Sequence, residues 1–338
     1  MKRTILFAVL LSLLTVSVSA QKAKAPERQG WDNEIDGPLY GDVESVVIIS
    51  YSLNDKFGKV VKDFVYNKKI YKFNQHGDVI DEAWYKRDGS REFKFLYKYD
   101  SQGNMIEKNR YSRDETLYKK TIWTYDSKGN MIEEAEYNSD GSLDYKALYK
   151  YNSKGNKIEE AWYKSDGSLV EKGLYKYDSK GNKIEKARYN SDGSLRGKAI
   201  HKHNRRGVTI EETEYNGNGS LSEKYLYKYD SQGNLIERAG YNSDGSLRWK
   251  DLYKYDSQGN MIEKAGYYND GSLSEKYLYK YDSQGNLIAR VDYNSDGSLR
   301  WKDIYKYDSQ GNWIEETRYE GEIMKSTKME VREIVYRK

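Results

Sequence analysis

The feature that most limits the fold of this chain is an internal repeat of 26 residues. Glycine recurs at this constant spacing, at Gly77, Gly103, Gly129, Gly155, Gly181, Gly207, Gly233, Gly259, Gly285 and Gly311. An isoleucine and a tyrosine recur with the same period, from Ile80 to Ile314 and from Tyr85 to Tyr319. A short repeat without insertions predicts an array in which each unit packs mainly on its neighbours.

Each repeat contains two turn signals, which divide it into half-repeats of 14 and 12 residues. The first turn is Asp-Ser-Gln-Gly-Asn at residues 256–260, and the second is Asn-Ser-Asp-Gly-Ser at residues 242–246. Such sequences are typical of a common hairpin loop, in which a type I turn is followed by a residue in the left-handed αL conformation. We expect the repeated glycines to supply that conformation. Glu115 replaces the glycine of one second turn, so we expect local strain there.

The segments between the turns predict β-strands. In residues 273–281 the odd positions read Leu, Glu, Tyr, Tyr and Tyr, and the even positions read Ser, Lys, Leu and Lys. Period-two alternation rich in tyrosine and bounded by turns indicates a strand. Both prolines, Pro26 and Pro38, precede the repeats, as expected of a sheet that needs its N–H groups. The predicted fold is all-β: an antiparallel β-hairpin meander of about twenty strands.

The strand faces and the curvature of this meander follow from the proposed turns. We expect Tyr253 and Tyr255 to share a face with Met261, Ala265 and Tyr267. Leu252, Ile262, Lys254 and Lys264 then lie on the other face. Because long sheets twist and curl, we expect a superhelical or shell-like coil. The pattern leaves open which face turns inward, and it leaves two terminal edges that can pair with another chain.

The two ends of the chain differ from the repeats. Residues 1–20, with Lys2, Arg3, an apolar run and Val18-Ser19-Ala20, predict a secretory signal peptide. We expect a flexible leader at 21–40, an N-terminal β cap at 41–70, the repeat array at 71–320, and a C-terminal capping strand at 321–338. No second long apolar run occurs, so we expect no integral membrane segment after signal removal.

The composition excludes several classes of function. The chain has 338 residues and no cysteine, which excludes disulfides, thiol catalysis and cysteine-based metal sites. Its net charge of +4, or +2 without Lys2 and Arg3, is too low for a dedicated nucleic-acid surface. The 35 tyrosines, 7 tryptophans and 6 phenylalanines are too many for a disordered chain.

The repeat resembles the Tyr-Asp repeat, also called the YD or RHS repeat, of bacterial surface proteins and toxins. The resemblance rests on Tyr229-Asp230, Gly233, Asn234 and the downstream Asp244-Gly245, and it covers residues from about 70 to 320. It implies β-hairpin arrays that spiral into shells, and binding of carbohydrate or partner proteins by some members. The period of 26 is longer than is usual in that family, and we expect no toxin domain, so the resemblance supports the fold more than a toxin role.

Near-identical repeats argue against catalysis, because an active site needs unlike residues in one pocket. His201 and His203 replace a Tyr-x-Tyr pair and suit a metal, but a drifted repeat explains them equally and no third ligand is evident. The Asp- and Asn-rich turns suggest Ca²⁺, yet turn formation alone accounts for them. We therefore predict no cofactor and no metal site.

The tryptophans are the candidate contacts for a ligand, because aromatic faces stack on sugars. These candidates are Trp84, Trp123, Trp162, Trp249 and Trp301. The leading hypothesis is an exported, non-enzymatic protein that binds a protein partner or cell-surface polysaccharide, and not nucleic acid. We expect it in the periplasm, secreted, or loosely attached to the surface. The alternatives are a structural cell-envelope component and a toxin-associated shell or secreted enzyme.

Overall fold

The structure, a computed structural model, describes residues 31, 38–56, 59–321 and 325–338. Within these ranges all regular elements are β-strands. The strands are β1 (Val43–Lys56), β2 (Lys59–Phe73), β3 (Val79–Tyr85), β4 (Arg91–Tyr99), β5 (Met105–Tyr111), β6 (Leu117–Tyr125), β7 (Met131–Asn138), β8 (Leu143–Tyr151), β9 (Lys157–Lys164), β10 (Leu169–Tyr177), β11 (Lys183–Asn190), β12 (Leu195–His203), β13 (Thr209–Asn216), β14 (Leu221–Tyr229), β15 (Leu235–Tyr241), β16 (Leu247–Tyr255), β17 (Met261–Tyr268), β18 (Leu273–Tyr281), β19 (Leu287–Tyr293), β20 (Leu299–Tyr307), β21 (Trp313–Glu320) and β22 (Lys325–Tyr336). The predicted signal peptide at 1–20 lies outside the described residues.

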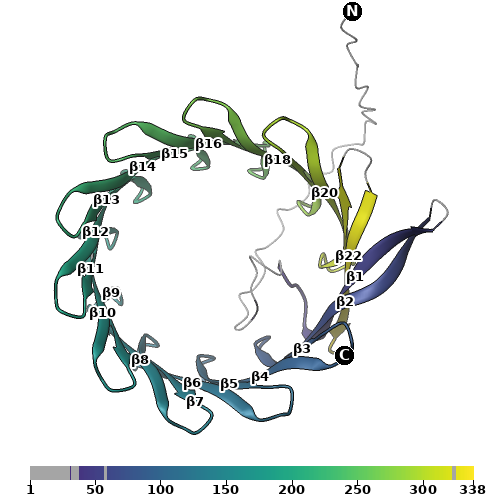
Figure 1. Cartoon of the computed structure of the whole chain (residues 1–338), viewed down its shortest axis with the longest axis horizontal. Coiled ribbons are helices and arrows are strands. Elements are labelled where there is room, and N and C mark those ends of the chain that lie inside the picture. The colour runs from purple at the N-terminus through teal and green to yellow at the C-terminus, as the bar shows by residue number, and fades with distance from the viewer. Residues whose placement is uncertain (1–30, 32–37, 57–58, 322–324) are drawn as a thin grey trace, which may run out of the picture.

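The 22 strands form one closed antiparallel sheet, a cylinder seen end-on in Figure 1. Each strand pairs with the next, and β1 also pairs with β22, with Ile49 opposite Val331. The predicted all-β hairpin meander is confirmed. Of the two predicted forms, a superhelical and a shell-like coil, the superhelix is not found: the sheet is a closed barrel, because the two predicted caps pair with each other and remove both edges. A sheet of this width is expected to curl, and here the curling is complete.

The turns have the predicted geometry. In the turn at 256–260 the Gly259 N–H donates to the Asp256 carbonyl at 3.1 Å, and the Asp256 N–H donates to the Asn260 carbonyl at 2.9 Å. Gly259 has a φ of 85°, and the other nine repeated glycines also have positive φ. Glu115 has a φ of 68° and is the one residue other than glycine with positive φ in the described ranges. The strain predicted at Glu115 is therefore confirmed.

The predicted division of the strand faces is wrong. Leu252 lies opposite Ala265, so these two share a face, whereas Tyr253 lies opposite Lys264. The reason is a β-bulge between Lys254 and the next residue, where the register shifts by one. A shift of one residue moves every side chain of the strand to the other face, and the bulge recurs at the end of each even-numbered strand from β4 to β20.

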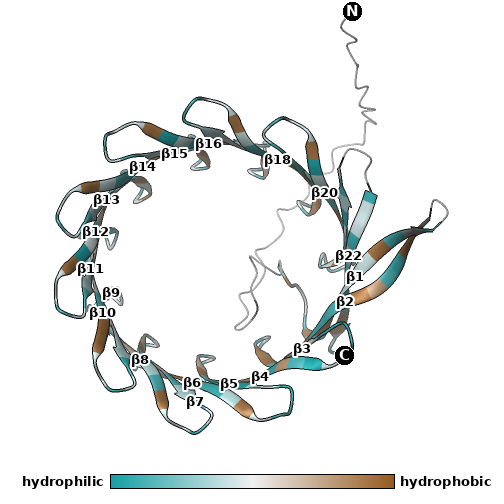
Figure 2. Ribbon diagram, viewed as in Figure 1, coloured by the Kyte–Doolittle hydropathy of each residue, from teal (hydrophilic) through white to brown (hydrophobic). Residues whose placement is uncertain are grey.

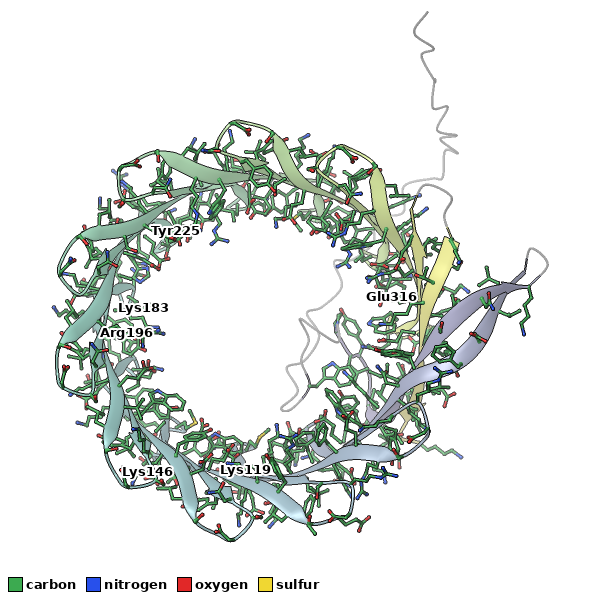
Figure 3. All side chains as sticks on the ribbon, viewed as in Figure 1. Lys119, Lys146, Lys183, Arg196, Tyr225 and Glu316 are labelled. Carbon is green, nitrogen blue, oxygen red and sulfur yellow. The ribbon has the colours of Figure 1, made fainter. Side chains whose placement is uncertain are left out.

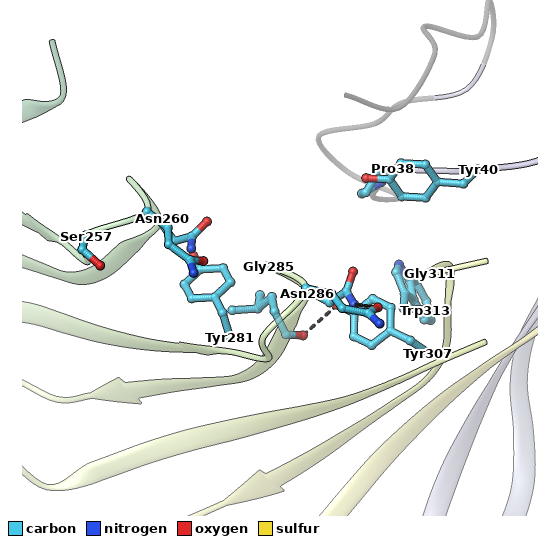
Figure 4. Close-up of a pocket in the computed structure, with 13 residues that line it drawn as sticks. Pro38, Tyr40, Ser257, Asn260, Tyr281, Gly285, Asn286, Tyr307, Gly311 and Trp313 are labelled. Atoms are coloured by element: carbon cyan, nitrogen blue, oxygen red, sulfur yellow. Dashed lines mark hydrogen bonds between the residues drawn. The ribbon is translucent and has the colours of Figure 1, made fainter. Parts of the chain in front are cut away.

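The Tyr-x-Tyr pairs face the cylinder axis, which we call the inner face. Tyr281 and Tyr307 line a hollow together with Pro38 and Tyr40, which lie within the cylinder (Figures 1 and 4). The turns of the 256–260 type therefore form the inner rim, and the other set of turns forms the wider, outer rim (Figure 1). This settles the question of which face is inward.

The largest apolar cluster lies inside the cylinder at the seam between its two ends. Leu39, Val43 and Val46 are fully buried there, with Tyr71 and Phe73 of β2 beside them. Trp31 packs edge-on against Tyr71, with ring centroids 5.0 Å apart. Most of the predicted leader at 21–40 lies outside the described residues, but Trp31 and Leu39 are buried in this cluster.

The outer face carries ladders of ion pairs. Figure 2 shows that the strands around the ring are largely polar with short apolar segments. Glu263 of β17 contacts Lys254 at 2.9 Å on one neighbouring strand and Lys276 at 3.5 Å on the other. The same arrangement recurs at Glu107, Glu159 and Glu211. Buried alanines such as Ala265 lie between these rows. Each glutamate thus ties three consecutive strands together.

Candidate binding surface inside the cylinder

The second tyrosine of each Tyr-x-Tyr pair forms a hydrogen-bond ladder around the inner face. Its hydroxyl donates to the backbone carbonyl of the residue 20 positions earlier, as from Tyr255 to Leu235 at 2.9 Å. The ladder members are Tyr99, Tyr125, Tyr151, Tyr177, Tyr229, Tyr255, Tyr281 and Tyr307. These tyrosines are part of the wall, because their polar ends already bond the neighbouring strand.

The first tyrosine of the pair lies beside inner-face carboxylates. Tyr97 and Tyr175 donate hydrogen bonds to Glu82 and Glu160, respectively. Burial, reinforced by nearby carboxylates, raises the pKa of Tyr149 and of Tyr253 to about 12. The inner aromatic rows therefore stay uncharged at neutral pH and offer ring faces rather than phenolates.

All five tryptophans predicted as ligand contacts face inward. Trp84 and Trp162 occupy one repeat position, Trp249 and Trp301 a second, and Trp123 a third. The pairing of Trp84 with Phe93, Trp162 with Glu171, Trp249 with Gly240, Trp301 with Asp292 and Trp123 with Glu134 places all of them on the inner face. The structure thus brings together on one surface residues that the sequence spreads over 218 positions (301 − 84 = 217, counted inclusively).

These tryptophans differ in what covers them. Lys69 lies 4.5 Å from the ring of Trp84, and the guanidinium groups of Arg300 and Arg318 lie 4.2 and 5.1 Å from the ring of Trp301. Cations on a ring face hold it in the wall and compete with a ligand. Trp301, which two guanidinium groups cover, is therefore the least available of the five.

Trp162 and Trp249 instead form half-exposed pairs with tyrosines. The ring of Trp162 lies 5.6 Å from that of Tyr145 at 34°, and the ring of Trp249 lies 6.2 Å from that of Tyr225 at 43°. Trp249 reaches Tyr225 across Gly240, where an added Cβ would lie 2.6 Å from the indole. The absence of a side chain at Gly240 therefore leaves the space in which the Trp249–Tyr225 pair forms. The guanidinium of Arg238 lies 4.9 Å from the Trp249 ring.

A hollow of about 650 Å³ lies between the inner rim and the N-terminal segment (Figure 4). Pro38 and Tyr40 form one side of it, and Tyr281, Tyr307 and Trp313 form the other. Sequence reasoning missed Trp31, which precedes the repeats, and Trp313, which stands at a repeat position that is Leu235, Met261 and Leu287 in earlier repeats. Arg332 lies 3.4 Å from the Trp313 ring and 5.2 Å from the Trp31 ring, which joins the two across the seam.

His201 and His203 lie side by side on the inner face, with ring centroids 6.5 Å apart. Burial lowers the pKa of His201, with Lys183 and Lys186 adding to the effect against Glu212. The described residues contain no group of three or more His, Cys, Asp or Glu side chains arranged to hold a metal ion. The turn carboxylates bind their own turns, as Asp256 does in accepting from the backbone N–H of Asn260 at 2.9 Å.

No known protein family matches the chain, and no curated protein resembles it in sequence. Among solved structures, a TcdB2-TccC3-TEV crystal structure is similar to it with 13% identity and a TM-score of 0.41, covering 80% of this chain and 16% of that one. A porin-like protein from Bacteroides uniformis is similar with 9% identity and a TM-score of 0.29, covering 87% of this chain and 98% of that one. Scores this low carry no argument about family or function, and the YD-repeat resemblance stays a prediction. In the part of the chain that the structure describes, no helix is long and apolar enough to cross a membrane.

Proposed function

We propose that this chain is an exported, non-catalytic protein whose inner face binds an extended carbohydrate. The observation that carries the proposal is the two half-exposed aromatic pairs, Trp162 with Tyr145 and Trp249 with Tyr225. Indole faces stack on sugar rings, and the polar groups between them can bond hydroxyls. An inner surface that repeats around a cylinder suits a ligand that is itself a repeating chain.

The polar part of this surface fits the same ligand. The inner face carries Glu212 and Glu214 on β13, Arg238 on β15 and Lys264 on β17. Carboxylate acceptors and cationic donors therefore both lie among the aromatic rows, and sugar hydroxyls can bond to either kind of group. Exposed aromatic rings with interspersed polar groups give orientation as well as affinity.

The test is binding of the mature protein, residues 21–338, to a panel of neutral and charged polysaccharides, with tryptophan fluorescence as the readout. Trp162→Ala with Trp249→Ala should weaken binding about tenfold or more, since truncation of a buried aromatic anchor often costs 2 kcal/mol. The matched control is Tyr66→Ala, because Tyr66 is an aromatic residue 64% exposed on the β1–β2 hairpin that projects away from the cylinder (Figure 1).

Loss of binding in the tryptophan double variant, with normal binding in the Tyr66→Ala control, supports the proposal. Equal binding by all three proteins would place the ligand elsewhere and contradict it. No binding by any member of the panel would also contradict it. The hypotheses of a protein partner or a structural envelope role would then take its place.

A further inference from the structure

Strand β11 presents three cations to the inside of the cylinder without a carboxylate to neutralise them. Lys183, Lys186 and Arg188 are inner-face residues of this strand, and Figure 3 labels Lys183 in this part of the wall. In the described ranges none of the three has a carboxylate oxygen within 4.0 Å, unlike the inner-face cations Lys264, Arg290 and Arg318. The inner face of the strand therefore carries positive charge that no direct ion pair neutralises.

The carboxylates nearest to this strand already have other partners. Glu160 contacts Lys157 at 2.6 Å and also accepts a hydrogen bond from Tyr175. Glu171 contacts Arg196 at 3.2 Å. Burial lowers the pKa of Lys186, and the neighbouring Arg188 lowers it further. An arriving anion would relieve this mutual repulsion, because opposite charge favours the charged form of each cation.

Arg188 also differs from its equivalents in that no side chain stands directly opposite it on either neighbouring strand. Its directly paired neighbours are Gly173 on β10 and Gly197 on β12. Arg188 is exposed, whereas the residue at the same position of every other repeat is buried or half-buried. Arg110, three repeats earlier, is an example: its guanidinium lies 4.2 Å from the ring of Phe93. The guanidinium of Arg188 is thus available for a bidentate contact.

A hollow of about 350 Å³ lies beside this guanidinium, where Gly197 and Ala199 leave β12 without large side chains. Its near wall is formed by Lys186, Arg188 and Arg196, and its far wall by Glu212 and Glu214 of β13. Burial raises the pKa of Glu214, and Glu212 and Glu223 raise it further. One wall therefore suits an anionic group, and the opposite wall suits hydroxyl groups that donate hydrogen bonds.

We propose that the hollow between β11 and β13 binds an acidic sugar unit, with its carboxylate or sulfate group on Lys186 and Arg188 and its hydroxyls toward Glu212 and Glu214. This inference rests on the proposed function, because it names the chemical class of the carbohydrate. A simple polyanion fits less well, since the carboxylates of β13 repel it. The buried Nε2 of His201, which has no hydrogen-bond partner, lies in the same part of the wall.

The test compares matched polymers that differ only in charge: dextran sulfate against dextran, and polygalacturonate against its methyl ester. Inorganic polyphosphate serves as a polyanion without sugar hydroxyls. We expect the mature protein to bind at least one charged polysaccharide tenfold or more tightly than its neutral partner. Binding should weaken as salt is added, because salt screens exposed charges. Equal affinity for both members of each pair, or tighter binding of polyphosphate than of either charged polysaccharide, would overturn the inference.

The variant Lys186→Gln with Arg188→Gln should lower affinity for the charged polymer about tenfold or more, because each substitution removes a charged hydrogen-bond donor. The control is Lys108→Gln with Arg110→Gln, which removes the same charges at the same repeat positions. An equal loss in both variants would show a non-specific charge effect and overturn the assignment to β11. If neutral polymers bind through Trp162 and Trp249 while neither charge variant matters, the acidic-sugar inference fails and the proposed function stands.

Discussion

At the scale of single residues, two positions show what a sequence can and cannot predict. The strain at Glu115 was predictable because eight other repeats have glycine in that turn. The burial of Asp292 was not predictable, because its neighbours come from strands whose faces the bulges reassign. Asp292 is fully buried, neither carboxylate oxygen has a hydrogen-bond partner, and Arg300 lies 3.6 Å away.

Replacing Glu115 by glycine should stabilise the protein. Glycine takes a φ of 68° without steric cost, so the free energy of unfolding should rise by about 1 kcal/mol. The lost contact with Arg91 is small, because Glu115 is 79% exposed. Denaturant unfolding measures the effect, and Glu115→Ala is the control that removes the contact but keeps the strain. A glycine variant no more stable than the alanine variant would contradict this interpretation.

Asp292→Asn should raise the melting temperature at pH 7, whereas Asp303→Asn should lower it. Burial raises the pKa of Asp292, so its ionised form destabilises the fold at neutral pH. That penalty disappears as the pH falls below the ordinary carboxyl pKa. Asp303 is equally buried but contacts Arg290 at 3.0 Å and Arg318 at 2.7 Å, and its loss should cost about 3 kcal/mol. Thermal melts of both variants between pH 3 and 7 test these two predictions. Melting temperatures that shift in the same direction at pH 7 would contradict them.

At the scale of elements, the sequence predicts the hairpins well and their faces poorly. Turn residues such as Asp256 and Gly259 act locally, so their pattern identifies each loop. The side of the sheet on which each side chain lies depends on whether the pairing of two strands stays in register as far as the last tyrosine. The bulge beside Tyr255 is a property of the paired strands and not of one strand alone. The inward position of the tryptophans was therefore beyond a sequence argument, although their presence was plain.

The tyrosine ladder predicts opposite effects for two matched substitutions. His203 occupies a ladder position, but its imidazole lacks the phenolic oxygen that bonds a carbonyl elsewhere. His203→Tyr should add the missing bond to the carbonyl of Lys183 and stabilise the protein by about 1 kcal/mol. Tyr229→Phe, one repeat later, should remove a 3.0 Å bond to the Thr209 carbonyl and cost a similar amount. Chemical denaturation measures both, and a destabilised His203→Tyr variant would argue against the ladder.

The outer glutamate ladders predict how stability depends on acid. Although burial raises the pKa of Glu107, hydrogen bonds from Lys98, Asn109 and Lys120 lower it to about 2. A carboxylate with a lowered pKa stabilises the fold above its ordinary pKa of 4.5, and this stabilisation is lost as the pH falls toward 2. The melting temperature should therefore decrease between pH 5 and pH 2.

A variant that removes the ladder carboxylates provides the control for this pH dependence. The pKa values of Glu159, Glu211 and Glu263 are also lowered, chiefly by hydrogen bonds from the lysines beside them. Changing Glu107, Glu159, Glu211 and Glu263 together to glutamine should lower the melting temperature at pH 7 and flatten its decline in acid. An unchanged slope would assign the acid sensitivity to other groups.

At the scale of the whole molecule, closure turns a repeated meander into a cylinder with an inner surface. Closure depends on the ends, which the repeat pattern does not describe. Asn312, fully buried, donates to the carbonyl of Tyr40 at 3.0 Å and to the hydroxyl of Tyr336 at 2.7 Å. Arg337 donates to the carbonyls of Phe73 and Asn74. The seam therefore includes specific contacts from Asn312 to Tyr40 and from Arg337 to Phe73 and Asn74, residues that lie more than 260 positions apart. Repeat periodicity alone predicts no such contact.

The measurement that tests the account most directly is disulfide formation across the seam, since the chain has no cysteine of its own. Ile49→Cys with Val331→Cys places the two thiols on directly paired residues of β1 and β22. Ile49→Cys with Glu315→Cys is the control, because Glu315 pairs with Val331 and so lies one strand farther away, about 9–10 Å from position 49. We predict a monomeric disulfide in the first variant and none in the second. Free thiols in both, or only disulfides between molecules, would show that the sheet is open and that the inner surface does not form.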